Sequence, residues 1–299
     1  MRSCTDRLGR NGVTLASYEV FRAALGAYLL LHFAALVPWG RELFSRAGML
    51  PDAAASPLAA LFPNVLAVAD SPAAVGALLG VSLVASVCLA AGWRDRLAAL
   101  VLCYALACLV GRNPLIANPS LPYVGWLLLA HALVGPGRAA RRAGAWRLPA
   151  PVFACAWLVM AAGYSYSGLC KLGSPAWLDG GALAAVLENP LARPTPLREA
   201  LLALPAPPLR AATWGALALE LGFLPLALVA RLRPWLWLAM VGMHLSLLAL
   251  IDFADLTAGM LLLHLYTLDP AWLHRVRAAL AGLCPRGVYG IRSRLQSWS

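Results

Sequence analysis

The stretch PAAVGALLGVSLVASVCLAA, residues 72–91, contains no charged side chain. At about 1.5 Å per residue, a helix of this length spans the roughly 30 Å hydrocarbon core of a bilayer. The stretch is rich in Ala and Leu, and it lacks the alternation of apolar and polar residues that is typical of a half-buried strand. We therefore predict a transmembrane helix over residues 72–91.

The composition extends this prediction to the whole chain. Hydrophobic residues make up 61% of the 299 residues and charged residues only 12%. In a soluble domain, about half of the residues are apolar and about a quarter are charged. We therefore predict an integral membrane protein of the all-α class, because long apolar runs favour a helix bundle over a β-barrel. The formal charge of +11 does not imply a nucleic-acid partner, since membrane proteins concentrate basic residues in cytoplasmic loops.

About eight membrane spans are expected from the apolar stretches. They cover residues 19–37, 72–91, 96–111, 121–137, 150–169, 211–230, 234–251 and 255–268. Arginines gather before the first span, in the 138–149 loop and after the last span, which predicts that this side is cytoplasmic. We expect a cytoplasmic N-terminal segment over 1–18, a transmembrane domain over 19–268 and a basic cytoplasmic tail over 269–299. The expected location is a bacterial inner membrane.

The 170–210 loop on the opposite side has a pattern of its own. AWLDGGALAAVLEN, residues 176–189, is apolar on one face but too short to span. It predicts one interfacial amphipathic helix that lies flat as a lid over 174–190, with Trp177 as its anchor. A Pro-punctuated segment then returns the chain to the sixth span.

Ionisable residues inside the spans are candidate site residues, because charge within a membrane is costly. The expected topology places Glu220, His131 and His244 at similar depths, with Lys171 at the outer end of the fifth span. We predict that these four side chains line one cavity that opens toward the outer half of the bilayer. We also expect Trp177 to form an aromatic wall there.

Each of these residues also has a structural interpretation. His131 or His264 could simply bond two helices together, and His32 is expected to do so. Arg22 can extend its charged end to the membrane surface, and Asp255 can be solvated at the interface. We expect no metal site, because no HxxxH or HExxH spacing places two ligands on one helix face.

Lys171 is the only lysine in the sequence, where arginine supplies every other fixed positive charge. A preference for arginine codons could leave one lysine by chance. The alternative is that this position needs a group that can lose its proton, which an amine does and a guanidinium does not. An apolar environment disfavours the ammonium form, and the neighbouring Tyr164, Tyr166 and Ser167 supply hydroxyl groups.

Four stretches resemble the HTTM family and the membrane domain of vitamin K-dependent gamma-carboxylases. They are YSYSGLCKLGSPAWLDGGAL (164–183), YEVFRAALGAYLLLHF with RAGMLP (18–33, 46–51), LELGFLPLALVARLRPW (219–235) and MHLSLLALIDFADLTAGMLLLHLYTLDPAWL (243–273). The similarity follows the order of the chain over nearly its whole length, although each motif is loose. The resemblance implies a polytopic helical fold.

The resemblance also implies an activity. In the carboxylases a lysine at the position of Lys171 is regarded as the base that deprotonates a reduced quinone, with O2 and CO2 as co-substrates. It therefore implies a catalytic role for Lys171, and the expected cavity adds Glu220, His131 and His244 as candidate catalytic residues. A reduced quinone similar to vitamin K or menaquinol would contact Tyr164, Tyr166, Trp177 and His264. The sequence shows no counterpart of the large luminal region of the animal enzyme, so we expect quinol or lipid chemistry rather than protein carboxylation.

Two other functions compete with this one. The chain could be a non-enzymatic, DoxX-like membrane protein that binds quinone or assembles with a partner. It could also transport a small anion, with Lys171 as the counter-charge. A counter-charge tolerates arginine at position 171, whereas a proton acceptor does not. The expected partners in every case are membrane lipids and a lipid-soluble small molecule.

Overall fold

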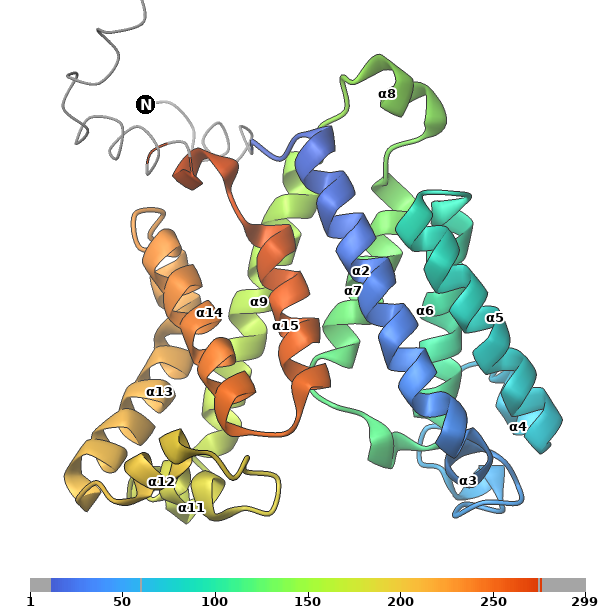
Figure 1. Cartoon of the computed structure of the whole chain (residues 1–299). Helices are drawn as coiled ribbons and strands as arrows, with labels where there is room; N and C mark the ends of the chain where they lie inside the picture. The colour runs from blue at the N-terminus through green and yellow to red at the C-terminus, as the bar shows by residue number, and fades with distance from the viewer. Residues whose placement is uncertain (1–11, 60, 274, 276–299) are drawn as a thin grey trace, which may run out of the picture.

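The computed structural model describes residues 12–59, 61–273 and 275. All regular elements among these residues are helices, and β-structure is limited to the isolated bridges Thr14–Arg147 and Ala192–Ile251. The predicted all-α class is confirmed (Figure 1). Of the predicted terminal segments, residues 1–11, 274 and 276–299 lie outside the described residues.

Eight long helices occupy the eight apolar stretches of the sequence. They are α2 (Leu15–Leu36), α5 (Pro72–Ala91), α6 (Asp95–Arg112), α7 (Leu121–Val134), α9 (Ala150–Lys171), α13 (Ala206–Ala227), α14 (Arg233–Leu250) and α15 (Ala254–Thr267). Four helical segments within the described ranges are long and apolar enough to cross a membrane: Leu15–Phe44, Pro72–Ala91, Ala150–Lys171 and Arg233–Leu250. The chain thus has the helices of an integral membrane protein.

Local sequence signals set the ends of α5, the helix of the opening stretch. Ser71 precedes the helix, and its side-chain oxygen accepts a hydrogen bond from the backbone N–H of Ala74 at 3.2 Å. Pro72 follows at the first helical position, where its missing N–H costs nothing. Gly92 ends the helix in the left-handed region at φ 73°, which glycine adopts without strain.

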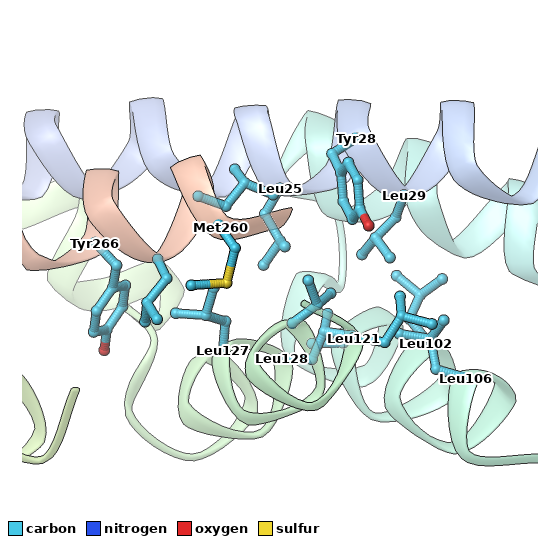
Figure 2. Close-up of a cluster of buried hydrophobic side chains, with 14 of the residues drawn as sticks. Leu25, Tyr28, Leu29, Leu102, Leu106, Leu121, Leu127, Leu128, Met260 and Tyr266 are labelled. Atoms are coloured by element: carbon cyan, nitrogen blue, oxygen red, sulfur yellow. The ribbon is translucent and has the colours of Figure 1, made fainter. Parts of the chain in front are cut away.

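The helices form two groups that are joined by α15 (Figure 1). In one group, α2 packs on α5, α5 on α6, and α6 on α7; in the other, α9 packs on α13, and α13 on α14. Helix α15 contacts α2, α7, α9 and α14. Figure 2 shows part of the buried core of the first group, where leucines of α2, α6 and α7 lie beneath α2 and Met260 of α15 points toward Leu127 of α7.

Large apolar side chains also cover the outside of the bundle. Leu31 of α2, Val84 of α5 and Leu158 of α9 are 72%, 64% and 58% exposed. Soluble monomers rarely expose contiguous apolar surface on this scale. This outer surface is therefore the one expected to contact lipid.

The 170–210 loop, called the outer loop after its expected side, differs from its prediction. The single helix expected over 176–189 is two short helices, α10 (Pro175–Leu178) and α11 (Ala182–Glu188), followed by α12 (Pro196–Leu202). The break occurs because Gly180 adopts φ 83°, and this glycine packs against Arg210 of α13, where a Cβ would lie 2.9 Å from the arginine side chain.

The loop is nevertheless folded against the bundle. Trp214 Nε1 of α13 donates to the carbonyl of Leu178 at 3.1 Å, and the N–H of Leu183 donates to Thr213 Oγ1 at 3.1 Å. At its far end, the N–H of Arg193 donates to the carbonyl of Leu250 at 2.8 Å. These contacts fix the short helices across one end of α9, α13 and α14 (Figure 1).

The remaining short helices lie at the two ends of the bundle (Figure 1). Helices α3 (Gly40–Phe44) and α4 (Val65–Val68) lie at the end that carries the outer loop, and α8 (Arg138–Ala143) lies at the opposite end. The arginine-rich segment 138–147 is therefore separated from Lys171 by the length of the bundle.

The crossing of α2 and α5 provides a test of the fold. A Cβ on Gly26 would lie 2.4 Å from the backbone nitrogen of Ala90, so the two helices can only approach this closely at a glycine. Gly26→Ala should lower the free energy of unfolding by about 1–3 kcal/mol, as overpacking does, which a thermal melt in detergent detects. Gly76→Ala is the control, because nothing lies within 4 Å of that added Cβ. Equal melting temperatures for the two variants would contradict this packing.

Candidate functional site

Lys171 forms an ion pair with Glu220 between α9 and α13. Lys171 Nζ donates to Glu220 Oε2, and it also donates to Ser167 Oγ, one helical turn away, at 2.9 Å. The Glu220 side chain is 7% exposed and that of Lys171 is 22% exposed. Two of the four side chains that were predicted to line one cavity are thus in direct contact.

The backbones of α9 and α13 approach each other closely beside this pair. Gly168 lies against α13, where a Cβ would be 2.8 Å from the nitrogen of Leu221. Pro225, inside α13, supplies no N–H for the carbonyl of Leu221. The hydroxyl of Ser165 approaches that carbonyl at 3.2 Å, and its oxygen accepts from the N–H of Leu224 at 2.9 Å. Ser165 had no predicted role, although a proline within an apolar helix leaves one backbone carbonyl without its usual N–H donor and so indicates that another group must supply one.

Trp177 of α10 covers the lysine. Its ring centroid lies 4.8 Å from Lys171 Nζ, a distance at which an aromatic face attracts a cation. A cavity of about 390 Å³ lies beside it, between α10 and α11 and the α14–α15 turn, lined by Trp177, Val186, Leu191 and Phe253 among others. The outer segment thus places an aromatic ring over the ion pair and leaves an adjoining apolar space.

A second polar cluster lies deeper in the bundle, where Tyr164 contacts two histidines. The Tyr164 hydroxyl is 2.7 Å from His244 Nε2 and 3.5 Å from His264 Nε2. His264 Nδ1 is 2.9 Å from the carbonyl of Met260, and a carbonyl can only accept, so this nitrogen carries the proton and Nε2 is an acceptor. All three side chains are buried, and His244 Nδ1 has no hydrogen-bond partner in the described part of the chain.

The two clusters share one face of α9. Tyr164 and Lys171 are seven residues apart, which places them roughly 20° apart around the helix and about 10 Å apart along it. Phe223 of α13, one turn from Glu220, packs against Tyr164 with ring centroids 5.0 Å apart. Tyr166 lies on the opposite face and is 70% exposed. The predicted grouping of Tyr166 with the other site residues is therefore wrong, because two residues along a helix is about 200° of rotation.

His131 belongs to a different cluster at the other end of the bundle. His131 Nε2 is 2.9 Å from Asp95 Oδ2, and its Nδ1 is 3.0 Å from the hydroxyl of Tyr18. Arg141 of α8 donates to the same carboxylate and, at 2.8 Å, to Glu19. The expectation that His131 shares a cavity with Lys171 is wrong, because α7 ends at residue 134 and brings His131 to the end of the bundle that carries α8.

Arg22 joins this cluster to α5 rather than reaching the membrane surface. It is 7% exposed, it pairs with Glu19 at 2.6 Å, and it donates to the carbonyls of Leu89 and Ala90 at the end of α5. Burial alone lowers the pKa of the Arg141 guanidinium, but hydrogen bonds and charges from Asp95 and Glu19 raise it above its usual value. This network is a structural clamp of fixed charges.

Among the described residues, three further ion pairs lie at the end of the bundle that carries the 170–210 loop, and one of them joins Arg112 to Asp70 at 3.6 Å. His32 Nδ1 is 2.9 Å from Asp255 Oδ1, and Asn118 Nδ2 donates to the other oxygen of that carboxylate. Arg193 pairs with Asp252 at 3.1 Å. His32 and Asp255 therefore bond α2 to α15, whereas Asn118 had no sequence signal. Within the described ranges, no group of three or more His, Cys, Asp or Glu side chains is arranged to hold a metal.

Comparison with known proteins gives no match: no family model, no curated protein and no solved structure is similar to this chain. The resemblance to the HTTM family therefore remains a prediction from sequence motifs. The geometry of the ion pair and of the tyrosine–histidine cluster is the observation on which function can be argued.

The ion pair can be tested by exchanging one or both partners. Lys171→Met alone should lower the free energy of unfolding by roughly 3 kcal/mol, because it leaves the Glu220 carboxylate buried without a partner. Glu220→Met alone should behave similarly, and the double variant should be close to wild type because no charge remains. Chemical unfolding of the four proteins in detergent measures this coupling. Additive losses in the double variant would contradict a direct pair.

The tyrosine–histidine cluster can be tested by removing one hydroxyl. Tyr164→Phe should lower the free energy of unfolding by about 1–3 kcal/mol, because it leaves buried histidine nitrogens without their partner. Tyr166→Phe, the same change on the lipid-facing side of α9, should have almost no effect. Thermal melts of both variants in one detergent provide the measurement. Equal effects would show that the Tyr164 hydroxyl forms no bond that matters for stability.

Proposed function

We propose that this chain is an eight-span membrane enzyme in which Lys171 takes a proton from a weakly acidic, lipid-soluble substrate of the quinol type. Both termini lie on the cytoplasmic side of a bacterial inner membrane, so the site opens toward the outer half of the bilayer. The observation that carries the proposal is the pairing of the only lysine with a buried glutamate, under an aromatic ring and beside an apolar cavity.

The direct contact with Glu220 fixes how the lysine can act as a base. A carboxylate bonded to an ammonium group holds the amine in its protonated form. In surroundings of low dielectric constant, however, the pair can also exist as a neutral amine beside a neutral carboxylic acid, because neither charge then needs solvation. Lys171 accepts a proton only from the second state. Glu220 therefore stores the proton that the amine must give up before it reacts.

The reaction step moves one proton. The hydroxyl of the substrate gives its proton to the neutral amine of Lys171, and the substrate becomes an anion beside the new ammonium group. A phenolic hydroxyl has a pKa of about 10, near that of an amine, so the transfer needs little driving force once both groups are out of water. Ser167 Oγ, 2.9 Å from Nζ, orients the amine.

The substrate is proposed to reach Lys171 from the lipid. The cavity beside Trp177 is lined by Ala176, Val186 and Leu191, which suit an aromatic head or an isoprenoid chain, and its polar groups are few. Trp177 offers its face to a flat ring close to the lysine. Tyr164 lies two turns from Lys171 on the same face of α9. With the two histidines that it contacts, it would hold the second oxygen of a quinol.

The tight ion pair also supports a second candidate. The ammonium group of Lys171 contacts both the Glu220 carboxylate and the ring of Trp177. A lysine held in this way would serve equally well as a fixed anchor in a non-enzymatic quinone-binding protein. The two candidates bind the same class of ligand and differ in whether the proton on Lys171 moves. The small-anion transporter is less well supported, because the positive charge of Lys171 already has a partner.

Replacement of Lys171 separates the candidates. Wild-type protein in lipid nanodiscs should accelerate the aerobic consumption of a reduced naphthoquinone, followed by absorbance and mass spectrometry. Lys171→Arg and Lys171→Ala should lower the rate by about 100-fold or more, as loss of a general base does. Small added amines should partly restore the alanine variant and not the arginine variant.

Tyr166→Phe is the control for this experiment, because Tyr166 faces away from the pair and should leave the rate unchanged. Full activity of Lys171→Arg would show that position 171 supplies only charge. If the wild type binds the reduced quinone and leaves it unreacted, with equal binding by Lys171→Arg, the non-enzymatic candidate is the correct one.

A further inference from the structure

A basic cavity lies at the end of the bundle opposite Lys171. Its volume is about 440 Å³, and it lies between the α5–α6 turn and the start of α8. Its charged lining consists of Arg94, Arg96, Arg138, Arg141 and a single carboxylate, Asp95. Figure 1 shows α8 at the same end of the bundle as this turn.

Most of the positive charge in this cavity has no acidic partner. Among the described residues, its ion pairs involve only Arg141, which contacts Asp95 and Glu19. Arg96 donates to the carbonyls of Ala132 and Leu133, at 2.7 and 2.8 Å, and these bonds fix the guanidinium without neutralising it. Arg94 and Arg138 are both exposed. The cavity is therefore a preformed site for an anion.

The backbone of the α5–α6 turn holds Arg94 in an unusual conformation. Arg94 has φ 47°, and it is the only residue other than glycine with a positive φ in the described part of the chain. This conformation costs a non-glycine residue about 1–2 kcal/mol. It places the arginine at the start of α6, with its guanidinium 5.8 Å from the ring centroid of the exposed Trp93.

An apolar groove adjoins the basic cavity. It has a volume of about 460 Å³ and runs along α5 and α6, lined by Val81, Val84, Trp93 and Val101 among others. Arg94 and Leu97 line both spaces, so the groove and the basic cavity meet at the α5–α6 turn. Arg94 thus lies between the other arginines of the basic cavity on one side and the apolar groove on the other.

We propose that the two spaces form one binding site for an anionic phospholipid. The phosphate group occupies the arginine-lined cavity, where guanidinium groups bond its oxygens in pairs, and an acyl chain lies in the groove between α5 and α6. Trp93 lies at the level of the headgroups, as tryptophans at membrane interfaces do. A free phosphate would use the cavity alone and gain nothing from the groove.

Lipid retention measures this site directly. Purified protein is equilibrated with equal amounts of phosphatidylglycerol and phosphatidylethanolamine of the same chain length, and the lipid retained per protein is counted by native mass spectrometry. The wild type should retain the anionic lipid preferentially. Arg94→Gln and Arg138→Gln should each lower that preference about fivefold, the effect of one basic side chain at a membrane surface.

Matched variants control both halves of the site. Arg142→Gln removes an exposed arginine of α8 that does not line the cavity, and it should leave the preference unchanged. Val84→Trp fills the groove and should lower retention of the anionic lipid, whereas Val87→Trp, an exposed residue of α5 outside the groove, should not. All of these positions are exposed, so the variants should fold, which a thermal melt checks.

Three results would overturn the proposal. They are equal retention of the two lipids by the wild type, an equal loss in Arg142→Gln and Arg94→Gln, and retention by Val84→Trp that matches wild type. Displacement of the bound lipid by millimolar inorganic phosphate would also overturn it, because the site would then recognise phosphate without the acyl chain.

Discussion

The pairing of buried charges with polar groups from other segments of the described chain is the constraint on which this structure depends. A helix bundle in lipid has no water to solvate a carboxylate or a guanidinium, so each must find its partner within the protein. Glu220 pairs with Lys171. Asp95 pairs with His131 and Arg141. Asp255 pairs with His32 and accepts a hydrogen bond from Asn118. These contacts cross from α13 to α9, from α6 to α7 and α8, and from α15 to α2. The polar side chains therefore fix which helices are neighbours, and the apolar core fills the space between them.

The polar groups are also segregated along the bundle, and this segregation gives each end a different chemistry. The end with α8 holds arginines and the clamp around His131, all of them groups whose charge is fixed or whose bonds are complete. The end with α10 and α11 holds the only lysine, next to a cavity and under a tryptophan. Between them lie Tyr164 and two buried histidines, and one ring nitrogen of His244 has no hydrogen-bond partner among the described residues. Tyr164, His244 and His264 thus lie on the α9 side of the bundle with Lys171, whereas His131 lies at the opposite end among arginines.

Lys171 is unusual because its partner both stabilises and restrains it. The ion pair with Glu220 ties α9 to α13, which favours a structural role, whereas the proposed catalysis needs a side chain that can give up its proton, which an amine can do. An arginine in the same place would keep the first property and lose the second. The choice of lysine at this position is therefore the feature of the chain that most directly bears on function.

The sequence by itself determined the all-α class and the approximate positions of the eight long helices, because these follow from apolar length. It also indicated that Glu220 needs a partner, since a carboxylate in an apolar stretch cannot stay alone. It did not determine the face of α9, since Tyr166 was grouped with Tyr164 and Lys171 although it lies on the opposite side. Only the tertiary structure decided which partners meet. The position of His131 along the bundle depended on where α7 ends. Arg22 is buried because it bonds to carbonyls of a different helix, α5. The loop helix breaks at Gly180 because Arg210 of α13 approaches it closely. These outcomes depend on contacts between segments far apart in the chain, and local sequence patterns carry no information about such contacts.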